Sequence, residues 1–507
     1  MDQVKIGWAR REISMEGPVV IPGQMHLRIS QGILDPLCAT VLVVDGGDDQ
    51  DSVIFCSLDV IVISRGITEM ISKLVLERCP EAPVGYIVMN ATHTHSSMEY
   101  WVDREEAITG EPVLNGLKTV RPHIARQCAD AICEAWENRA PGGISYGYGF
   151  AVVAHSRRVC YMDDVGLRSD NSVAPNGHAV MYGNTADPMF SHYEAGADHF
   201  TNLLFTFDGN EKLTGMIVNV PCPSQNSGNF SMLSADYWHN VRQLVAKEFG
   251  DDVYVLPQCA AAGDLAPRTL HYKQAQARRM ELKYGLSYDL KNLRGQNTDN
   301  YNRSMAERYD IAQRIVDSVC EVYDWARKDI KTHVPVHHVS KTIALNRRMI
   351  TEGEKVWAEE NIEKMRQQIP DKTKGTVEEI RIATTRFESI RNRNLRAINR
   401  YENQKDEPTV DAQLHVVSID DVAFSTSRFE VYQDFMHRLQ ARSPFLQTFV
   451  IQMGGDEEST YLATQRATEN KGYSASLFCN QVSAEGGQQW VENTLAILKG
   501  FKEKDEV

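Results

Sequence analysis

The sequence lacks the features that tie a chain to a membrane or to an oxidising compartment. It has no uninterrupted apolar run of about 18 residues, which a membrane-spanning helix requires. The first residues, MDQVKIGWARREI, contain no apolar segment of the kind that a signal peptide carries. The ten cysteines include no Cys-x-x-Cys pair. We therefore expect reduced core thiols in a cytoplasmic protein rather than a disulfide framework.

Positive charge is also in short supply. Lys and Arg number 54 against 68 Asp and Glu, which gives a formal net charge of −14. Nucleic acids and anionic membranes bind through basic surfaces, so neither is expected as the main partner. The composition, with 42% hydrophobic and 24% charged residues, is typical of a globular protein. We expect a small-molecule substrate, no nucleic-acid partner and no membrane insertion, and this composition is compatible with a homo-oligomer.

Helical and strand-like patterns alternate through the first half of the chain. Two apolar runs joined by a Gly/Asp turn predict a β-hairpin over 38–45 and 52–59. Ser234 is a candidate N-cap of a following helix, and Gly250 a candidate stop. The other expected elements are helices at 67–80, 117–139 and 234–250 and strands at 85–90, 212–220 and 253–258. Such alternation predicts a layered α/β domain.

The character of the sequence changes near residue 269 and changes back near 409. Polar amphipathic helices dominate between these points, and their Arg and Glu residues are most simply a solvated face. We therefore predict an α/β (layered α+β) fold of mixed sheets flanked by helices, interrupted by a helical insertion. The expected division is a first catalytic part over 1–268, the insertion over 269–408 and a completing catalytic part over 409–507.

Two histidines follow the predicted strand at 85–90, in the motif NATHTHSS. Residues i and i+2 of a strand share a face, so His93 and His95 are expected to converge on one point. Buried imidazoles need partners for their ring nitrogens, and a zinc ion is one such partner. A polar strand end exposed to solvent is the alternative interpretation.

Three further segments carry candidate chemistry. Cys222 lies between two prolines in NVPCPSQN and is either a metal thiolate or a buried small hydrophobe. Gly263 and Asp264 predict a tight loop where backbone N–H groups can approach a substrate. The alternative interpretation is an ordinary strand–loop junction. Glu430 lies three residues after Ser427, which is also the spacing of a helix capping box.

Taken in order, these segments resemble the catalytic N-terminal domain of the neutral/alkaline, non-lysosomal ceramidase family. The resemblance begins at VKIGWARREIS and continues through GILDPLCATVLVVD, VIFCSLDVIVIS and, most specifically, NATHTHSS. It returns at AAAGDLAP and FSTSRFEVY and ends at YLAT and GYSA. It covers most of 1–265 and 410–500, while the helical stretch between them matches poorly. The chain is thus identified as a divergent cytoplasmic member of that family.

The resemblance implies a zinc site and its surrounding groups. The implied ligands are His93, Glu430 and Tyr461, with Cys222 standing where the family has a zinc-binding histidine. His95 is implied beside the metal, Tyr473 as the group that polarises the scissile carbonyl, and Arg157 as a substrate contact. The family's serine falls on Ala260, so direct attack by a serine is not expected here.

These residues predict a zinc-dependent hydrolase in which an activated water attacks an amide or ester of a small polar or sugar-derived molecule. His95 or Asp264 would take the proton. Arg158 is expected to bind substrate, and Tyr100 and Trp101 either stack on a sugar ring or belong to the core. The alternatives are a zinc-dependent lyase or glycoside-cleaving enzyme and a metal-free binding protein on the same fold.

Overall fold

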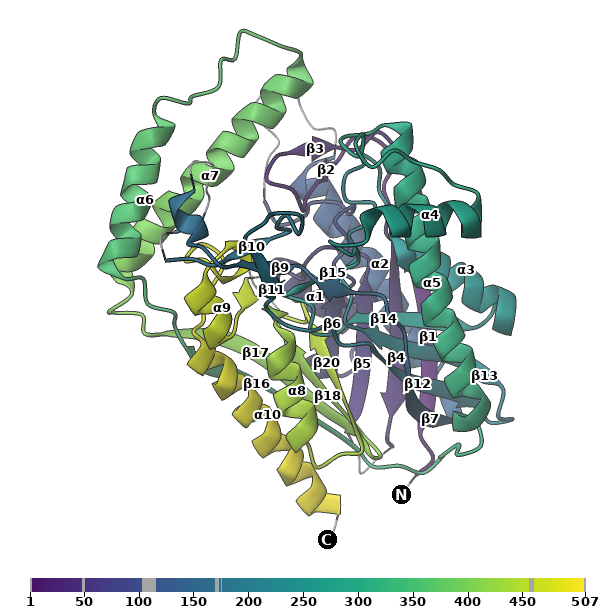
Figure 1. Ribbon diagram of the computed structural model, residues 1–507. Coiled ribbons are helices and arrows are strands. Elements are labelled where there is room, and N and C mark those ends of the chain that lie inside the picture. Colours follow the sequence, from purple (N-terminus) through teal and green to yellow (C-terminus); the bar gives the residue numbers. More distant parts are fainter. Residues whose placement is uncertain are drawn as a thin grey trace.

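The computed structural model describes residues 2–47, 51–102, 115–168, 173–174, 176–455 and 460–505. Two mixed sheets organise the chain (Figure 1). The first has eight strands in the order β14 (Tyr254–Cys259), β13 (Leu213–Val220), β12 (Phe200–Asp208), β7 (Ala140–Phe150), β1 (Lys5–Glu12), β4 (Cys38–Asp45), β5 (Ser52–Leu58) and β6 (Ile87–Ala91). The second has four, in the order β16 (Val336–Asn346), β17 (Thr409–Ile419), β18 (Val422–Ser427) and β20 (Gln447–Gln452).

A central apolar core lies between these sheets. Both halves of the eight-stranded sheet contribute to it, and so does the four-stranded sheet. Phe424 of β18 packs against Phe55 of β5 and Phe449 of β20, with ring centroids 5.0 and 4.5 Å apart. Strands such as β4 are buried along their whole length, which explains why their sequences are continuously apolar rather than alternating.

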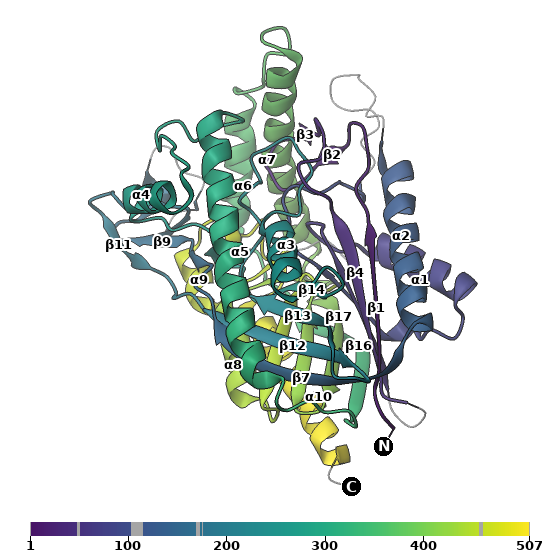
Figure 2. The ribbon, with the colours of Figure 1, turned by 90° about the vertical axis from the view of Figure 1, so that its right-hand side faces the viewer.

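Helices cover the outer faces of the sheets, as Figures 1 and 2 show. Helices α1 (Arg65–Arg78) and α2 (Leu117–Glu137) pack on the β1–β4–β5 half, while α3 (Tyr237–Phe249) and α5 (Thr298–Ala326) pack on the β7–β12–β13 half. Helices α8 (Gln433–Arg442) and α10 (Ala484–Asp505) cover the four-stranded sheet. Among the helices of the described part of the chain, none has the length and apolar character that crossing a bilayer requires.

The predicted α/β layering is confirmed, and its details differ in two places. Helix α3 begins at Tyr237, and its N-cap is Asp236, whose carboxylate accepts a hydrogen bond from the Tyr237 amide; Ser234 hydrogen-bonds to Asp35 instead. Gly250 ends the helix with a φ of +110°, as its sequence position predicts. Glu430 is not a helix cap: it lies on β19 (Glu430–Val431), and α8 begins only at Gln433.

The range 269–408 is not helical throughout. It holds α4 (Lys273–Tyr284), α5, α6 (Glu352–Met365) and α7 (Val377–Asn403), but also β16, which pairs with β17. The α6–α7 hairpin extends away from the sheets (Figure 1). Short elements complete the fold: β2 (Val20–Ile21), β3 (Arg28–Ile29), η1 (Val84–Tyr86), β8 (His155–Ser156), β9 (Arg158–Tyr161), η2 (Val165–Leu167), β10 (Ala179–Met181), β11 (Phe190–Tyr193), β15 (Leu265–Ala266), β19, β21 (Tyr461–Leu462), α9 (Gln465–Asn470) and η3 (Tyr473–Ala475).

Candidate active site

The two histidines of NATHTHSS lie in the loop that follows β6, not in the strand itself. Strand β6 ends at Ala91, and His93 has a φ of 60°, in the left-handed region that residues other than glycine rarely adopt. This turn brings the Nε2 atoms of His93 and His95 to 3.4 Å, with the rings perpendicular. The loop after β13 holds it in place, because the Ser224 carbonyl accepts a hydrogen bond from the His95 amide.

Backbone carbonyls fix the protonation of both rings. Nδ1 of His93 lies 2.8 Å from the Ile61 carbonyl, and Nδ1 of His95 lies 2.9 Å from the Gly23 carbonyl. A carbonyl only accepts hydrogen bonds, so each Nδ1 carries a proton. Burial lowers the pKa of His95 well below its usual value, and the nearby His93 and Arg28 add to this. The Nε2 of His95 is therefore an acceptor, and the Gln225 amide donates to it at 3.0 Å.

Glu430 and Tyr461 are brought together by strand register. They are directly paired in the short parallel ladder of β19 and β21. The Glu430 carboxylate lies 3.4 Å from Nε2 of His93 and 3.3 Å from the Arg157 guanidinium, which also donates to the Tyr461 hydroxyl at 3.3 Å. Burial would raise the pKa of Glu430, but His93, Arg157 and Tyr461 together hold it below its usual value. Glu430 is thus a buried carboxylate.

The glycine of the GDLAP loop allows this close approach. The Arg157 guanidinium donates to the Gly263 carbonyl at 2.8 Å, which sets its orientation toward Glu430. A Cβ on Gly263 would lie 2.5 Å from the Glu430 carbonyl oxygen, inside van der Waals contact. The loop therefore serves the site through backbone packing, because only glycine leaves room for the strand that carries Glu430.

Tyr473, on η3, forms the next wall of the site. Its ring centroid lies 6.1 Å from that of Tyr461. Arg393 of α7 donates to its hydroxyl at 2.8 Å, with the guanidinium 4.8 Å from the ring centroid. Burial raises the pKa of Tyr473, with the neighbouring Cys479 contributing in the same direction, so the hydroxyl keeps its proton at neutral pH. Tyr473 can therefore donate a hydrogen bond into the cavity.

These side chains line one cavity with a volume of about 1010 Å³, which we call the histidine cavity. Its lining includes the candidate residues His93, His95, Arg157, Glu430, Tyr461 and Tyr473. The sequence did not single out the other polar side chains that complete the lining: Gln24, Tyr182, Gln225, Arg386, Arg393, Arg396, Asn399, Arg400, Thr460 and Gln481. Gln225 directly follows the segment NVPCPS, which contains the candidate ligand Cys222. This position in the chain is the sequence feature that could have identified Gln225 as a residue of the site.

Cys222 does not line the histidine cavity. Its side chain is fully buried in the apolar cluster beneath α3 and α5, and its thiol donates toward the Val153 carbonyl at 3.3 Å. Burial raises the pKa of Cys222 well above its usual value, with Cys259 contributing in the same direction. A neutral thiol in an apolar core matches the small-hydrophobe interpretation of this residue.

Four other candidates also lie outside the cavity. Asp264 is buried beside the start of α8, where it accepts a hydrogen bond from the Gln433 amide at 3.3 Å. Arg158 forms a buried ion pair with Glu194, with the shorter contact at 2.5 Å. Tyr100 is buried in the core next to α2, and the half-buried Trp101 packs against the same core. These positions are structural ones in this fold.

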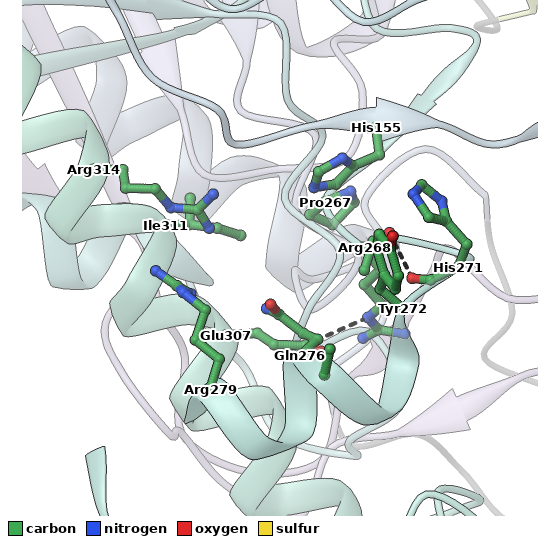
Figure 3. Close-up of a pocket in the computed structure, with 12 residues that line it drawn as sticks. His155, Pro267, Arg268, His271, Tyr272, Gln276, Arg279, Glu307, Ile311 and Arg314 are labelled. Atoms are coloured by element: carbon green, nitrogen blue, oxygen red, sulfur yellow. Dashed lines mark hydrogen bonds and ion pairs between the residues drawn. The ribbon is translucent and has the colours of Figure 1, made fainter. Parts of the chain in front are cut away.

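A second cavity, of about 540 Å³, lies beside α4 and α5 (Figure 3). Its cations already have acidic partners. Arg268 lies 3.4 Å from Glu307 across this cavity, as Figure 3 shows. Arg279 and Arg314 both pair with Asp310, at 2.6 and 2.7 Å. This charge balance distinguishes it from the histidine cavity, where Glu430 is the sole carboxylate among the described lining residues.

Two donors of the histidine cavity, Nε2 of His93 and the Glu430 carboxylate, are of the type and at the spacing of zinc ligands. Ligand atoms about 2.0–2.1 Å from a tetrahedral zinc lie roughly 3.3–3.4 Å apart. The 3.4 Å between His93 Nε2 and the Glu430 carboxylate matches that spacing, and the Tyr461 hydroxyl interacts with the same carboxylate. No group of three or more His, Cys, Asp or Glu side chains in the described part of the chain is arranged to hold a metal.

The fold is shared with solved ceramidases, although no known protein-family model and no curated protein matches the sequence. Neutral ceramidase from Pseudomonas aeruginosa matches with a TM-score of 0.64 and 14% sequence identity, over 98% of this chain and 75% of that one. A ceramidase complexed with C2 matches with a TM-score of 0.63 and 12% identity, over 99% of this chain and 76% of that one. The chain therefore has a ceramidase-like fold.

Proposed function

We propose that the protein is a zinc-dependent hydrolase that cleaves an amide or ester bond of a small polar molecule in the histidine cavity. One observation carries the proposal. The buried imidazole of His93 and the half-buried imidazole of His95, whose Nδ1 atoms are held by carbonyls, direct their Nε2 atoms toward each other, and that of His93 also lies near the Glu430 carboxylate. Facing acceptors at 3.4 Å repel one another unless a cation lies near them.

His93 and Glu430 are the ligands that this arrangement favours, with Tyr461 beside them. Nitrogen and oxygen donors suit zinc, and the buried Cys222 thiol plays no part in this version of the site. A bound zinc ion would supply Lewis-acid chemistry, polarising a carbonyl and lowering the pKa of water.

His95 is the base in this proposal. Its Nε2 is unprotonated because its Nδ1 proton is committed to the Gly23 carbonyl, and it lines the cavity. Gln225 donates to Nε2 and thereby fixes the direction of the ring. A neutral imidazole in this position can accept a proton from an attacking water and return it to the leaving group.

Tyr473 and Arg157 would stabilise the negative charge that develops on the attacked carbonyl oxygen. The Tyr473 hydroxyl accepts from Arg393, which leaves its own proton free to donate. The Arg157 guanidinium is held by the Gly263 carbonyl and by Tyr182 at 3.2 Å, so it needs little reorganisation. Donors fixed in advance are an effective form of such stabilisation, because they need no reorganisation during the reaction.

Elemental analysis of the purified protein tests the proposal. We expect about one zinc per chain, lost in His93→Ala and Glu430→Gln and retained in Cys222→Ser, which serves as the matched control. A panel of N-acyl compounds should then be hydrolysed by the wild type and by Cys222→Ser but not by His93→Ala. Zinc that is lost in Cys222→Ser, with the other two variants unaffected, would contradict this assignment.

A metal-free binding protein is the second candidate, and one observation favours it. Arg157 already forms an ion pair with Glu430 at 3.3 Å, so the carboxylate has a cationic partner without any metal. This candidate predicts no metal in the wild type and no hydrolysis of any amide or ester. The lyase or glycoside-cleaving alternative gains no such support, because Tyr100 and Trp101 lie in or against the core.

A further inference from the structure

The wall of the histidine cavity opposite the strands is built from arginines. Arg386, Arg393, Arg396 and Arg400 of α7, which we call the α7 arginines, all line the cavity. They are separated by seven, three and four residues, the spacing that places side chains on one face of a helix. Arg157 adds a fifth guanidinium from the other side of the cavity.

The α7 arginines have no acidic partners. Among the described residues, no carboxylate lies within ion-pair distance of any of the four. Arg391, which does not line the cavity, pairs with Glu388 at 3.2 Å. In a chain with a net charge of −14, four arginines without a described carboxylate in ion-pair distance thus face one cavity.

Two of these arginines are held in place and only partly satisfied. Arg393 donates to the Tyr473 hydroxyl at 2.8 Å. Arg400 donates to the Leu477 carbonyl at 2.7 Å, yet its Nε atom is buried without a hydrogen-bond partner. Burial, together with Arg348 and Arg347, lowers the pKa of Arg400 to about 10. A buried cation with open donors and cationic neighbours is stabilised by an incoming anion.

We propose that the substrate of the histidine cavity carries an oxyanion group, a carboxylate or a phosphate, that the α7 arginines bind. This inference rests on the proposed function, since it assigns the substrate class of the same cavity. Guanidinium groups match the oxygens of carboxylates and phosphates through paired hydrogen bonds. Arg393, one of the α7 arginines, contacts Tyr473, which in the proposed function donates to the reacting carbonyl. The acid group of the substrate is therefore expected to lie close to its scissile bond.

Matched probe pairs test the inference by binding, separately from hydrolysis. One pair is N-acetylglutamate and its neutral diamide; the other is N-acetylglucosamine 6-phosphate and N-acetylglucosamine. Calorimetry on the full chain is expected to give about tenfold or tighter binding of the acid form in at least one pair. Which pair shows the preference distinguishes a carboxylate from a phosphate. Raising NaCl from about 0.05 to about 0.5 M should weaken only the acid form.

Variants assign the preference to α7. Arg393→Gln combined with Arg396→Gln is expected to reduce the preference below about threefold, whereas the matched control Arg391→Gln retains it. Arg396→Gln alone is the second variant, because Arg396 is exposed to the cavity and makes no hydrogen bond that folding needs. Equal affinity within both pairs, including no binding at all, overturns the inference, as does a preference that survives in the double variant.

Hydrolysis of the same probes separates the two proposals. An acid preference without any hydrolysis would mean that the anion site stands and the proposed hydrolase function fails. Hydrolysis of the neutral probes without any acid preference would mean the reverse. The two results come from independent measurements on the same protein.

Discussion

Replacing Asp264 by asparagine is expected to stabilise the protein at neutral pH. The Asp264 side chain is buried near the N-terminus of α8 and accepts one hydrogen bond, from the Gln433 amide. Burial raises its pKa to about 6 from an ordinary value of 3.8. The ionised form is therefore disfavoured in the folded protein, and an asparagine oxygen can accept the same hydrogen bond without carrying a charge.

The magnitude follows from the two pKa values. A carboxyl whose folded pKa is raised contributes stability fully below about pH 4, where it is protonated in both states, and this contribution is lost as the pH rises to about 6. The gap between the two values, at about 1.4 kcal/mol per pH unit, corresponds to about 3 kcal/mol. Above pH 6, Asp264→Asn is thus expected to increase the free energy of unfolding by up to about 3 kcal/mol.

Urea denaturation at about pH 4 and about pH 7.5 measures this difference. The gain of Asp264→Asn over the wild type should be large at the higher pH and small at the lower one. Asp251→Asn, at an exposed loop position, is the control and should show little change at either pH. A loss of stability at pH 7.5, or a gain that is the same at both pH values, would refute the reasoning. Hydrolysis should survive in Asp264→Asn, since Asp264 does not line the histidine cavity.

Three more substitutions probe the site and the core. Gly23→Ala places a Cβ 2.6 Å from Nδ1 of His95 at a φ of +95°, so hydrolysis should fall at least tenfold and the melting temperature should drop; an unchanged rate would show that the His95 ring tolerates displacement. Glu194→Gln leaves the Arg158 guanidinium buried without a counter-charge and should cost about 3–5 kcal/mol in denaturant unfolding; a cost below about 1 kcal/mol would argue against this. Phe424→Ala empties the central core between the sheets and should cost about 3–5 kcal/mol, and a much smaller loss in calorimetric unfolding would mean that the sheets close over the space.

The sequence predicts the layers of the fold well because apolar runs and turn residues carry local information. The hairpin of β4 and β5 and the helix ending at Gly250 need only their own residues. The β19–β21 pairing of Glu430 with Tyr461 depends on contacts between distant segments. A capping-box spacing at Ser427 and Glu430 was therefore a reasonable local interpretation that the sheet overrides.

Side-chain direction is the part of the site that sequence patterns do not supply. Cys222 stands at the expected place in the chain, yet its thiol faces the core beneath α3 and α5. Arg157 and Arg158 are adjacent, but only the first reaches the cavity. The α7 arginines were attributed to a solvated face because helical charge periodicity is the same whether the face meets bulk water or lines a cavity.

The connection between β16 and β17 places the α6–α7 hairpin at a single point of the four-stranded sheet. Asn346 at the end of β16 is paired with Thr409 at the start of β17, so the chain leaves the sheet and returns to it at the same point. Everything between, including the α6–α7 hairpin and its four cavity arginines, is inserted at one position of an intact ladder. Insertions, deletions or grafts within 347–408 are therefore expected to change which molecules are accepted while leaving the register of β16 and β17 as it is.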